Sequence, residues 1–95
     1  MSKIKIGETL RRSVRIDNSA DTTAQYCISA VANIEGETIT TFAEGEVANG
    51  GATLARWSRY REDTLTIRYA VAEGREDILA AIEAFCADAQ AAVSA

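Results

Sequence analysis

The stretch TLTIRYAVA, residues 64–72, places a large apolar side chain at every second position: Leu65, Ile67, Tyr69 and Val71. A period of two indicates a β-strand with one face turned to a core. After Gly74 the period changes, and one helical stripe carries Ile78, Leu79, Ile82, Phe85, Cys86, Ala89 and Val93. The sequence therefore predicts a strand followed by a helix, with their apolar faces buried against each other.

The upstream sequence predicts more strands. Four further strands are expected at residues 9–17, 22–35, 38–47 and 52–61, after a short extended stretch at 3–6. Turn-forming residues separate them, at positions 18–21, 35–36, 49–51 and 62–63, in a chain without proline. A helix over 52–62 would place Glu62 and Asp63 at its negative end, which argues against it.

Residues 22–35 fit two kinds of structure. As a helix, they would be capped by Asp21, would use Thr22 and Gln25 as a capping box, and would end at Gly36. As a strand, they place apolar side chains on one face, and their β-branched and aromatic content is typical of strands. We expect the strand and keep the helix as the alternative.

These elements predict one α+β domain over residues 1–95. Its architecture is an antiparallel β-meander of about five strands, with one C-terminal α-helix packed on one face. The chain has 47% hydrophobic residues, which fits a globular protein with a modest core. No apolar run approaches the roughly 20 residues of a membrane span, and no signal peptide is evident. We therefore expect a cytoplasmic protein that does not enter the membrane.

Composition also restricts the chemistry. The chain has no histidine, which removes the commonest general base and the usual zinc sites. Its two cysteines, Cys27 and Cys86, have no metal-ligand spacing, and on opposite faces of the sheet they would remain reduced and unlinked. The sequence thus predicts no catalytic residues, no metal site and no cofactor, and we expect a protein that is not an enzyme.

Charge is unevenly distributed along the chain. Residues 1–17 carry five basic and two acidic side chains, whereas 18–55 carry five acidic side chains and no Lys or Arg. A two-residue turn at 62–63 would pair Tyr60 with Leu65 and Trp57 with Arg68. In that register Tyr60, Ser58 and Leu54 face the helix, and Trp57 lies exposed on the open face of the sheet.

The open face then defines a candidate binding site. Its members are Trp57, Arg59, Arg61, Arg68, Arg11 and Arg15. Indole and guanidinium planes stack on rings or bases, and arginine binds phosphate or carboxylate. A purely structural interpretation is a cross-strand cation–π pair between Trp57 and Arg68, with Glu44 and Glu46 neutralising the neighbouring arginines.

Three hypotheses for the function follow. The first is a small binding module that contacts a protein partner, or a second copy, through the open sheet face or its edge strand. The second is nucleic-acid or anion binding by the Trp/Arg patch, although the net charge of −4 is unusual for such a protein. The third is a small acidic inhibitor, encoded by a mobile element, that occupies the basic groove of a nucleic-acid-binding machine.

Overall fold

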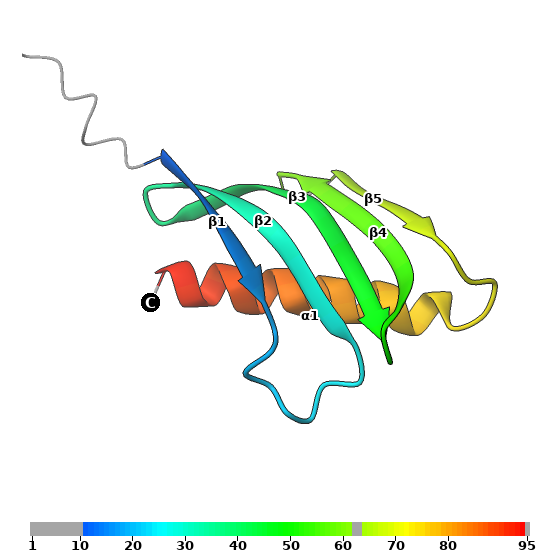
Figure 1. Ribbon diagram of the computed structural model, residues 1–95. Helices are drawn as coiled ribbons and strands as arrows, with labels where there is room; N and C mark the ends of the chain where they lie inside the picture. Colours follow the sequence, from blue (N-terminus) through cyan, green and yellow to red (C-terminus); the bar gives the residue numbers. More distant parts are fainter. Residues whose placement is uncertain (1–10, 62–63, 95) are drawn as a thin grey trace, which may run out of the picture.

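The computed structural model describes residues 11–61 and 64–94 and confirms the α+β architecture. Five strands form one antiparallel sheet in chain order, and one helix follows them (Figure 1). The elements are β1 (Arg11–Asp17), β2 (Cys27–Glu35), β3 (Thr38–Asn49), β4 (Ala52–Tyr60), β5 (Thr64–Tyr69) and α1 (Arg75–Ser94). The expected extended stretch at residues 3–6 lies outside the described residues.

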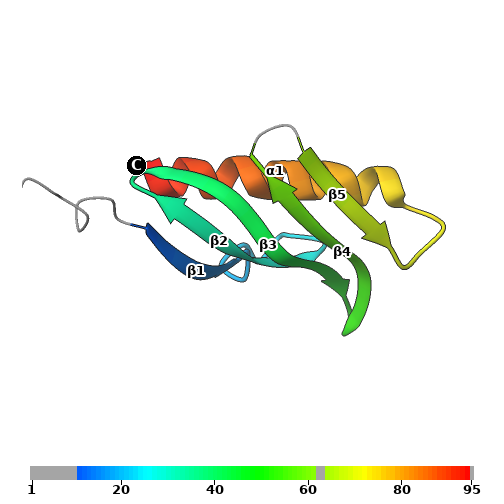
Figure 2. The same ribbon diagram turned by 90° about the horizontal axis from the view of Figure 1, so that it is seen from above.

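Sheet and helix form two layers. Figure 2, seen from above, shows α1 along one side of the sheet, where it crosses the strands and lies closest to β3. The buried residues of α1 are Ile78, Ile82, Phe85 and Cys86, as the apolar stripe predicts. The odd-numbered apolar residues of β5 pack at the margin of the same core, as expected, whereas Leu79 is only half-buried and lies outside it.

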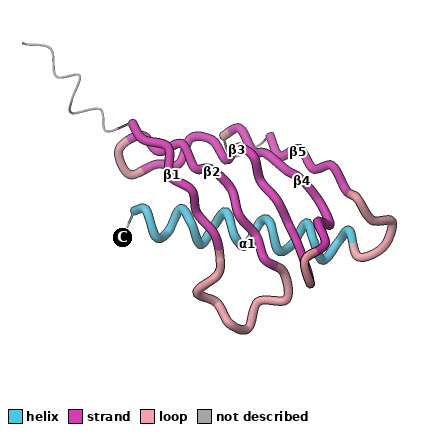
Figure 3. Tube along the Cα trace, in the orientation of Figure 1, coloured by secondary structure: helices cyan, strands magenta, loops and turns pink. Residues whose placement is uncertain are grey.

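Residues 22–35 divide into a loop and a strand. β2 begins at Cys27, so the strand assignment is confirmed for residues 27–35, and residues 22–26 belong to the longest described connection, from 18 to 26 (Figure 3). Asn18 holds this loop closed: its Nδ2 donates to the Tyr26 carbonyl at 2.8 Å, and its Oδ1 accepts from the Ile28 N–H at 2.9 Å. The loop is therefore tied to the start of β2.

Two tight turns connect the central strands. Gly50 and Gly51 both have positive φ, 61° and 85°, as a two-residue hairpin turn of the mirror-image type requires. The turn between β2 and β3 consists of Gly36 and Glu37, one residue later than expected. Both hairpins keep the meander in chain order.

The register between β4 and β5 differs from the expected one. β4 ends at Tyr60, which pairs with Thr64, the first residue of β5, so that three residues and not two separate the paired ends. Arg61 adopts a left-handed φ of 62°, and its N–H donates to the Thr40 carbonyl at 2.9 Å. A slip of one residue turns every β4 side chain to the opposite face. Trp57 therefore lies opposite Ile67 and faces α1, and the expected exposure of Trp57 is wrong.

Trp57 lies at the centre of the core. It is only 4% exposed, and its ring lies 5.6 Å from that of Phe42 and 6.0 Å from that of Phe85. Gly45 on β3 leaves the space that the indole occupies, because a Cβ there would lie 2.6 Å from the indole Nε1. The three aromatic rings join β3, β4 and α1, so the core depends on the absence of a side chain at position 45.

The two cysteines lie on opposite sides of the sheet. Cys27 is exposed at the start of β2, on the open face, whereas Cys86 is buried under α1. Neither cysteine forms a disulfide, as the strand assignment of residues 27–35 predicts. Within the described residues, no helix is both long enough and apolar enough to cross a membrane.

Candidate functional site

The structure divides the predicted Trp/Arg patch. Trp57 and Arg59 lie on the face that α1 covers, because the one-residue register shift moves both of them there. Arg59 is half-buried beside Cys86, and its Nε donates to the Arg61 carbonyl at 3.2 Å. The expectation that these two residues form an exposed binding surface is therefore wrong.

The remaining predicted arginines are spread over the sheet. Arg68 on β5 and Arg15 on β1 are exposed on the open face, as expected, but they occupy the two edge strands. Four inter-strand spacings of about 4.8 Å separate those strands by about 19 Å. Arg61 lies in the turn, with its guanidinium 5.2 Å from the Tyr60 ring, and Arg11 begins β1 opposite Glu35. These residues do not converge on one ligand.

The open face is polar. Arg56 replaces Trp57 as the neighbour of Arg68, and Glu46 lies on the other side of Arg56. Tyr60, which was expected to face α1, is 56% exposed. Strand positions around this row carry hydroxyl and amide side chains: Ser29, Asn33, Thr41, Ser58 and Thr66. Two adjacent guanidinium groups can attract an anion, and Tyr60 is the large aromatic side chain exposed on this face.

A smaller hollow of about 460 Å³ lies near the β2–β3 hairpin. Arg12 and Glu35 line it with opposite charges. The polar groups at its base bond to one another, since Ser13 Oγ donates to Asn33 Oδ1 at 2.6 Å and Thr40 Oγ1 donates to the Asn33 carbonyl at 3.1 Å. It presents few groups to a ligand.

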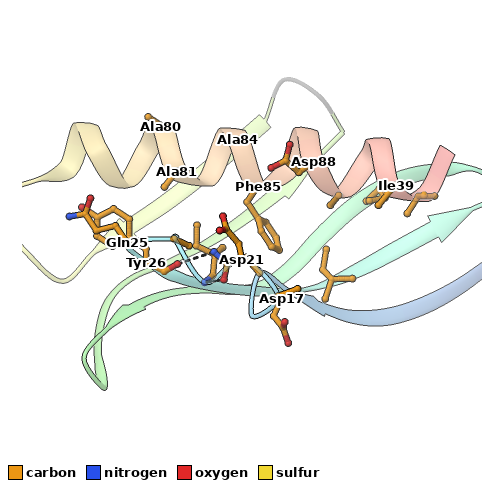
Figure 4. A pocket seen from close by; sticks show the side chains of 18 of the residues that line it. Asp17, Asp21, Gln25, Tyr26, Ile39, Ala80, Ala81, Ala84, Phe85 and Asp88 are labelled. Carbon is orange, nitrogen blue, oxygen red and sulfur yellow. Dashed lines mark hydrogen bonds between the residues drawn. The ribbon is translucent and has the colours of Figure 1, made fainter. Parts of the chain in front are cut away.

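A larger groove lies between α1 and the loop that joins β1 to β2. It has a volume of about 710 Å³ and is hereafter the α1 groove. Figure 4 shows the helix above and the loop below, with Phe85 reaching down from α1 between them. Its lining consists of Ile16, Asp17, Asn18, Ala20, Asp21, Ala24, Gln25, Tyr26, Ile28, Ile39, Asp77, Ala80, Ala81, Ala84, Phe85, Asp88, Ala89, Ala92 and Val93.

The walls of the α1 groove are mostly apolar. The sheet side contributes larger side chains, Ile16, Ile28 and Ile39, and the helix side is largely alanine. This helix flank, Ala80 to Val93, spans about 20 Å at about 1.5 Å per residue. A long channel with small residues on one wall leaves room for another segment of polypeptide.

Hydrogen bonds fix both walls. Gln90 anchors the C-terminal half of α1 to the β2–β3 hairpin, because its Oε1 accepts from the Ile39 N–H and its Nε2 donates to the Glu37 carbonyl, each at 2.9 Å. Asn18 anchors the opposite wall, as described above. Gln90 therefore fixes the helix wall of the groove, and Asn18 fixes its loop wall. Neither role was predicted from the sequence.

Among the described residues, the charged side chains that line the α1 groove are all acidic. Asp21 comes from the loop, and Asp77 and Asp88 come from α1, whereas the Asp17 carboxylate is turned away from the helix (Figure 4). Hydrogen bonds from the hydroxyl and the N–H of Thr23 lower the pKa of Asp21. Asp21 is therefore ionised at neutral pH, and the groove has a negative rim.

The sequence did contain a signal for this site. No Lys or Arg occurs in residues 18–55 or in residues 76–95, and these two segments supply nearly the whole lining. The absence of basic residues from 18–55 is apparent in the sequence, but the sequence does not place the loop beside the helix flank. Among residues 11–61 and 64–94, no cluster of three or more metal-ligating side chains occurs. The α1 groove is suited to binding.

Comparison of the chain with protein-family models, with curated proteins and with solved structures finds no match.

Proposed function

We propose that this protein is a small, non-enzymatic interaction module that binds a segment of a partner protein in the α1 groove. The observation that carries the proposal is the groove itself: an apolar channel of about 710 Å³ between α1 and the β1–β2 loop. Apolar side chains of a partner gain free energy when they leave water for such a surface.

The shape of the groove favours a polypeptide over a compact ligand. A volume of about 710 Å³ falls within the range of small-molecule sites. However, the lining follows α1 for about four turns, from Ala80 to Val93, which matches a helix or an extended segment laid alongside it. The polar groups of the lining are the four aspartates together with Asn18, Gln25 and Tyr26, and the aspartates come from both the loop and α1.

The competing hypotheses have less support. Nucleic-acid binding relied on Trp57 with the arginines, and Trp57 is buried while the arginines lie on separate strands. The open sheet face stays accessible to a protein, and Tyr60 is exposed on it, but its other apolar side chains include Val31 and Ala43, which are only partly exposed. The α1 groove has an apolar lining along about four turns of α1.

Two tryptophan substitutions test the proposal. Ala84→Trp places an indole in the α1 groove, whereas Ala87→Trp places one on the solvent side of the same helix, since Ala84 lines the groove and Ala87 does not. Both alanines are exposed, so thermal melts should show that both variants fold. We expect proteins that co-purify with the wild-type chain from native lysate to be lost with Ala84→Trp and retained with Ala87→Trp.

Nuclease treatment of the same lysate separates the hypotheses. The set of captured proteins should not change, because the proposed contact does not need nucleic acid. Retention of all partners by Ala84→Trp, or their loss after nuclease treatment, would rule out the α1 groove as the binding site.

A further inference from the structure

We infer that the segment that binds in the α1 groove is an amphipathic helix whose polar face carries Lys or Arg. This inference rests on the proposed function and adds the chemistry of the partner. It excludes α1 of a second copy as the occupant, and it excludes an acidic or phosphorylated peptide.

Charge is the first argument. Within residues 11–61 and 64–94, every charged side chain that lines the groove is an aspartate, at positions 17, 21, 77 and 88, and no Lys or Arg of this part of the chain lines it. The nearest basic residue on α1 is Arg75, which is engaged elsewhere: its Nε donates to the Val71 carbonyl at 2.7 Å, and its guanidinium lies 5.0 Å from the Tyr69 ring. A cationic segment therefore meets only attractive charges along the rim.

The small side chains on the α1 wall of the groove are the second argument. The groove side of α1 presents small residues at successive turns, among them Ala80, Ala84 and Ala92. Small side chains allow two helices to approach closely, and the spacing between helix axes depends on the side chains at the contact. An incoming helix would place apolar residues at i, i+3, i+4 and i+7 against the isoleucines of the sheet side. Its Lys or Arg side chains would extend outward to Asp21 and Asp88.

Charge also decides against self-association through this surface. The exposed side of α1 in a second copy would bring Glu76, Asp77, Glu83 and Asp88 toward the same rim. Like charges placed close together are unfavourable, and a low ionic strength increases the repulsion. The occupant is therefore not α1 of a second copy, and its chemistry is that of a basic segment of a partner protein.

Three designed peptides test the inference. Each is an 18-residue helix with leucine at the same apolar positions, and the polar positions carry lysine in the first, glutamine in the second and glutamate in the third. Binding to the full chain is followed by fluorescence anisotropy at two salt concentrations. We expect the lysine peptide to bind about tenfold more tightly than the glutamine peptide, because two or three exposed ion pairs of modest strength each contribute.

Matched variants show whether the preference comes from the groove. Asp21→Asn with Asp88→Asn removes two charges from the rim, and the lysine preference should fall to about twofold or less, with unchanged affinity for the glutamine peptide. Glu73→Gln with Glu83→Gln removes two exposed charges outside the groove and should keep the preference. Ala84→Trp should abolish binding of both peptides.

The outcomes separate this inference from the proposed function. If the glutamine peptide binds as well as the lysine peptide and Ala84→Trp abolishes both, the groove binds proteins but the inference about charge is wrong. If the lysine preference falls equally with the control pair, the attraction is a property of the whole acidic chain, and the inference is again wrong. If no peptide binds, or if Ala84→Trp has no effect, both proposals fail.

Discussion

The effect of Gly45→Ala should change sign with the residue at position 57. Gly45 has no positive φ, so its backbone conformation is accessible to alanine. In the wild-type chain the new Cβ would lie 2.6 Å from the Trp57 Nε1, and the rigid indole cannot move without displacing Phe42 and Phe85. Overpacking of this kind costs about 1 to 3 kcal/mol of unfolding free energy.

The same substitution should be harmless once the indole is gone. In a Trp57→Leu background the clash is absent, and replacing glycine by alanine restricts the unfolded chain, which stabilises by about 0.4 to 1 kcal/mol. The coupling energy between the two positions should therefore reach about 1.4 to 4 kcal/mol, the difference between the two effects. A 95-residue domain with about 5 to 14 kcal/mol of stability tolerates both single variants, so all four proteins of the cycle can be measured.

Urea denaturation with linear extrapolation provides the measurement, and the m-value should stay constant across the four proteins. If Trp57 lay on the open face, as the sequence first indicated, Gly45→Ala would stabilise the wild-type chain. Stabilisation of the wild type, or a coupling energy close to zero, would therefore refute the placement of Trp57 over Gly45.

Three further predictions concern the core, the thiols and the acidic loop. Phe85→Ala should cost about 3 to 5 kcal/mol of unfolding free energy in urea melts, since Phe85 is buried between sheet and helix; a loss below about 1 kcal/mol would contradict this packing. Cys27 should react at once with a thiol reagent and Cys86 only on unfolding, because Cys86 is covered and burial raises the pKa of its thiol; equal labelling rates, or a mass two protons lower, would contradict it. Hydrogen bonds lower the pKa of Asp17 and Asp21, so their stabilising contribution is present above the unfolded pKa near 4 and is lost as pH falls through the lower folded values. Asparagine at both positions should therefore reduce the fall in the urea midpoint between pH 5 and pH 2.5, whereas an unchanged fall would contradict the argument.

Local patterns were sufficient to predict the type and order of the elements. Alternation in residues 64–72 and the stripe from Ile78 to Val93 depend only on the chain's own periodicity, and the hairpin turns follow from glycine and asparagine. The register of β4 against β5 depends instead on whether the turn has two or three residues. The sequence of the turn does not show that Arg61 takes a left-handed conformation, and this single residue decides the face of Trp57.

The α1 groove could not be predicted for a different reason. Its walls come from residues 16–28, Ile39 and residues 77–93, which are brought together by long-range contacts such as those of Gln90 with the β2–β3 hairpin. Ala80, Ala84 and Ala92 lie off the apolar stripe of α1, so periodicity assigns them to the solvent side. The absence of Lys and Arg from residues 18–55 indicated an acidic segment, but nothing in the sequence placed that segment beside α1.

A photocrosslinking measurement tests the α1 groove most directly. The photoreactive residue p-benzoylphenylalanine is placed at Ala92, which lines the groove, or at the adjacent Ala91, which is equally exposed but lies outside it. After irradiation in cells that hold the full chain and its partners, we predict a covalent protein adduct from position 92 that disappears with Ala84→Trp, and no matching adduct from position 91. Equal adducts from both positions, or an adduct at 92 that persists with Ala84→Trp, would contradict the account.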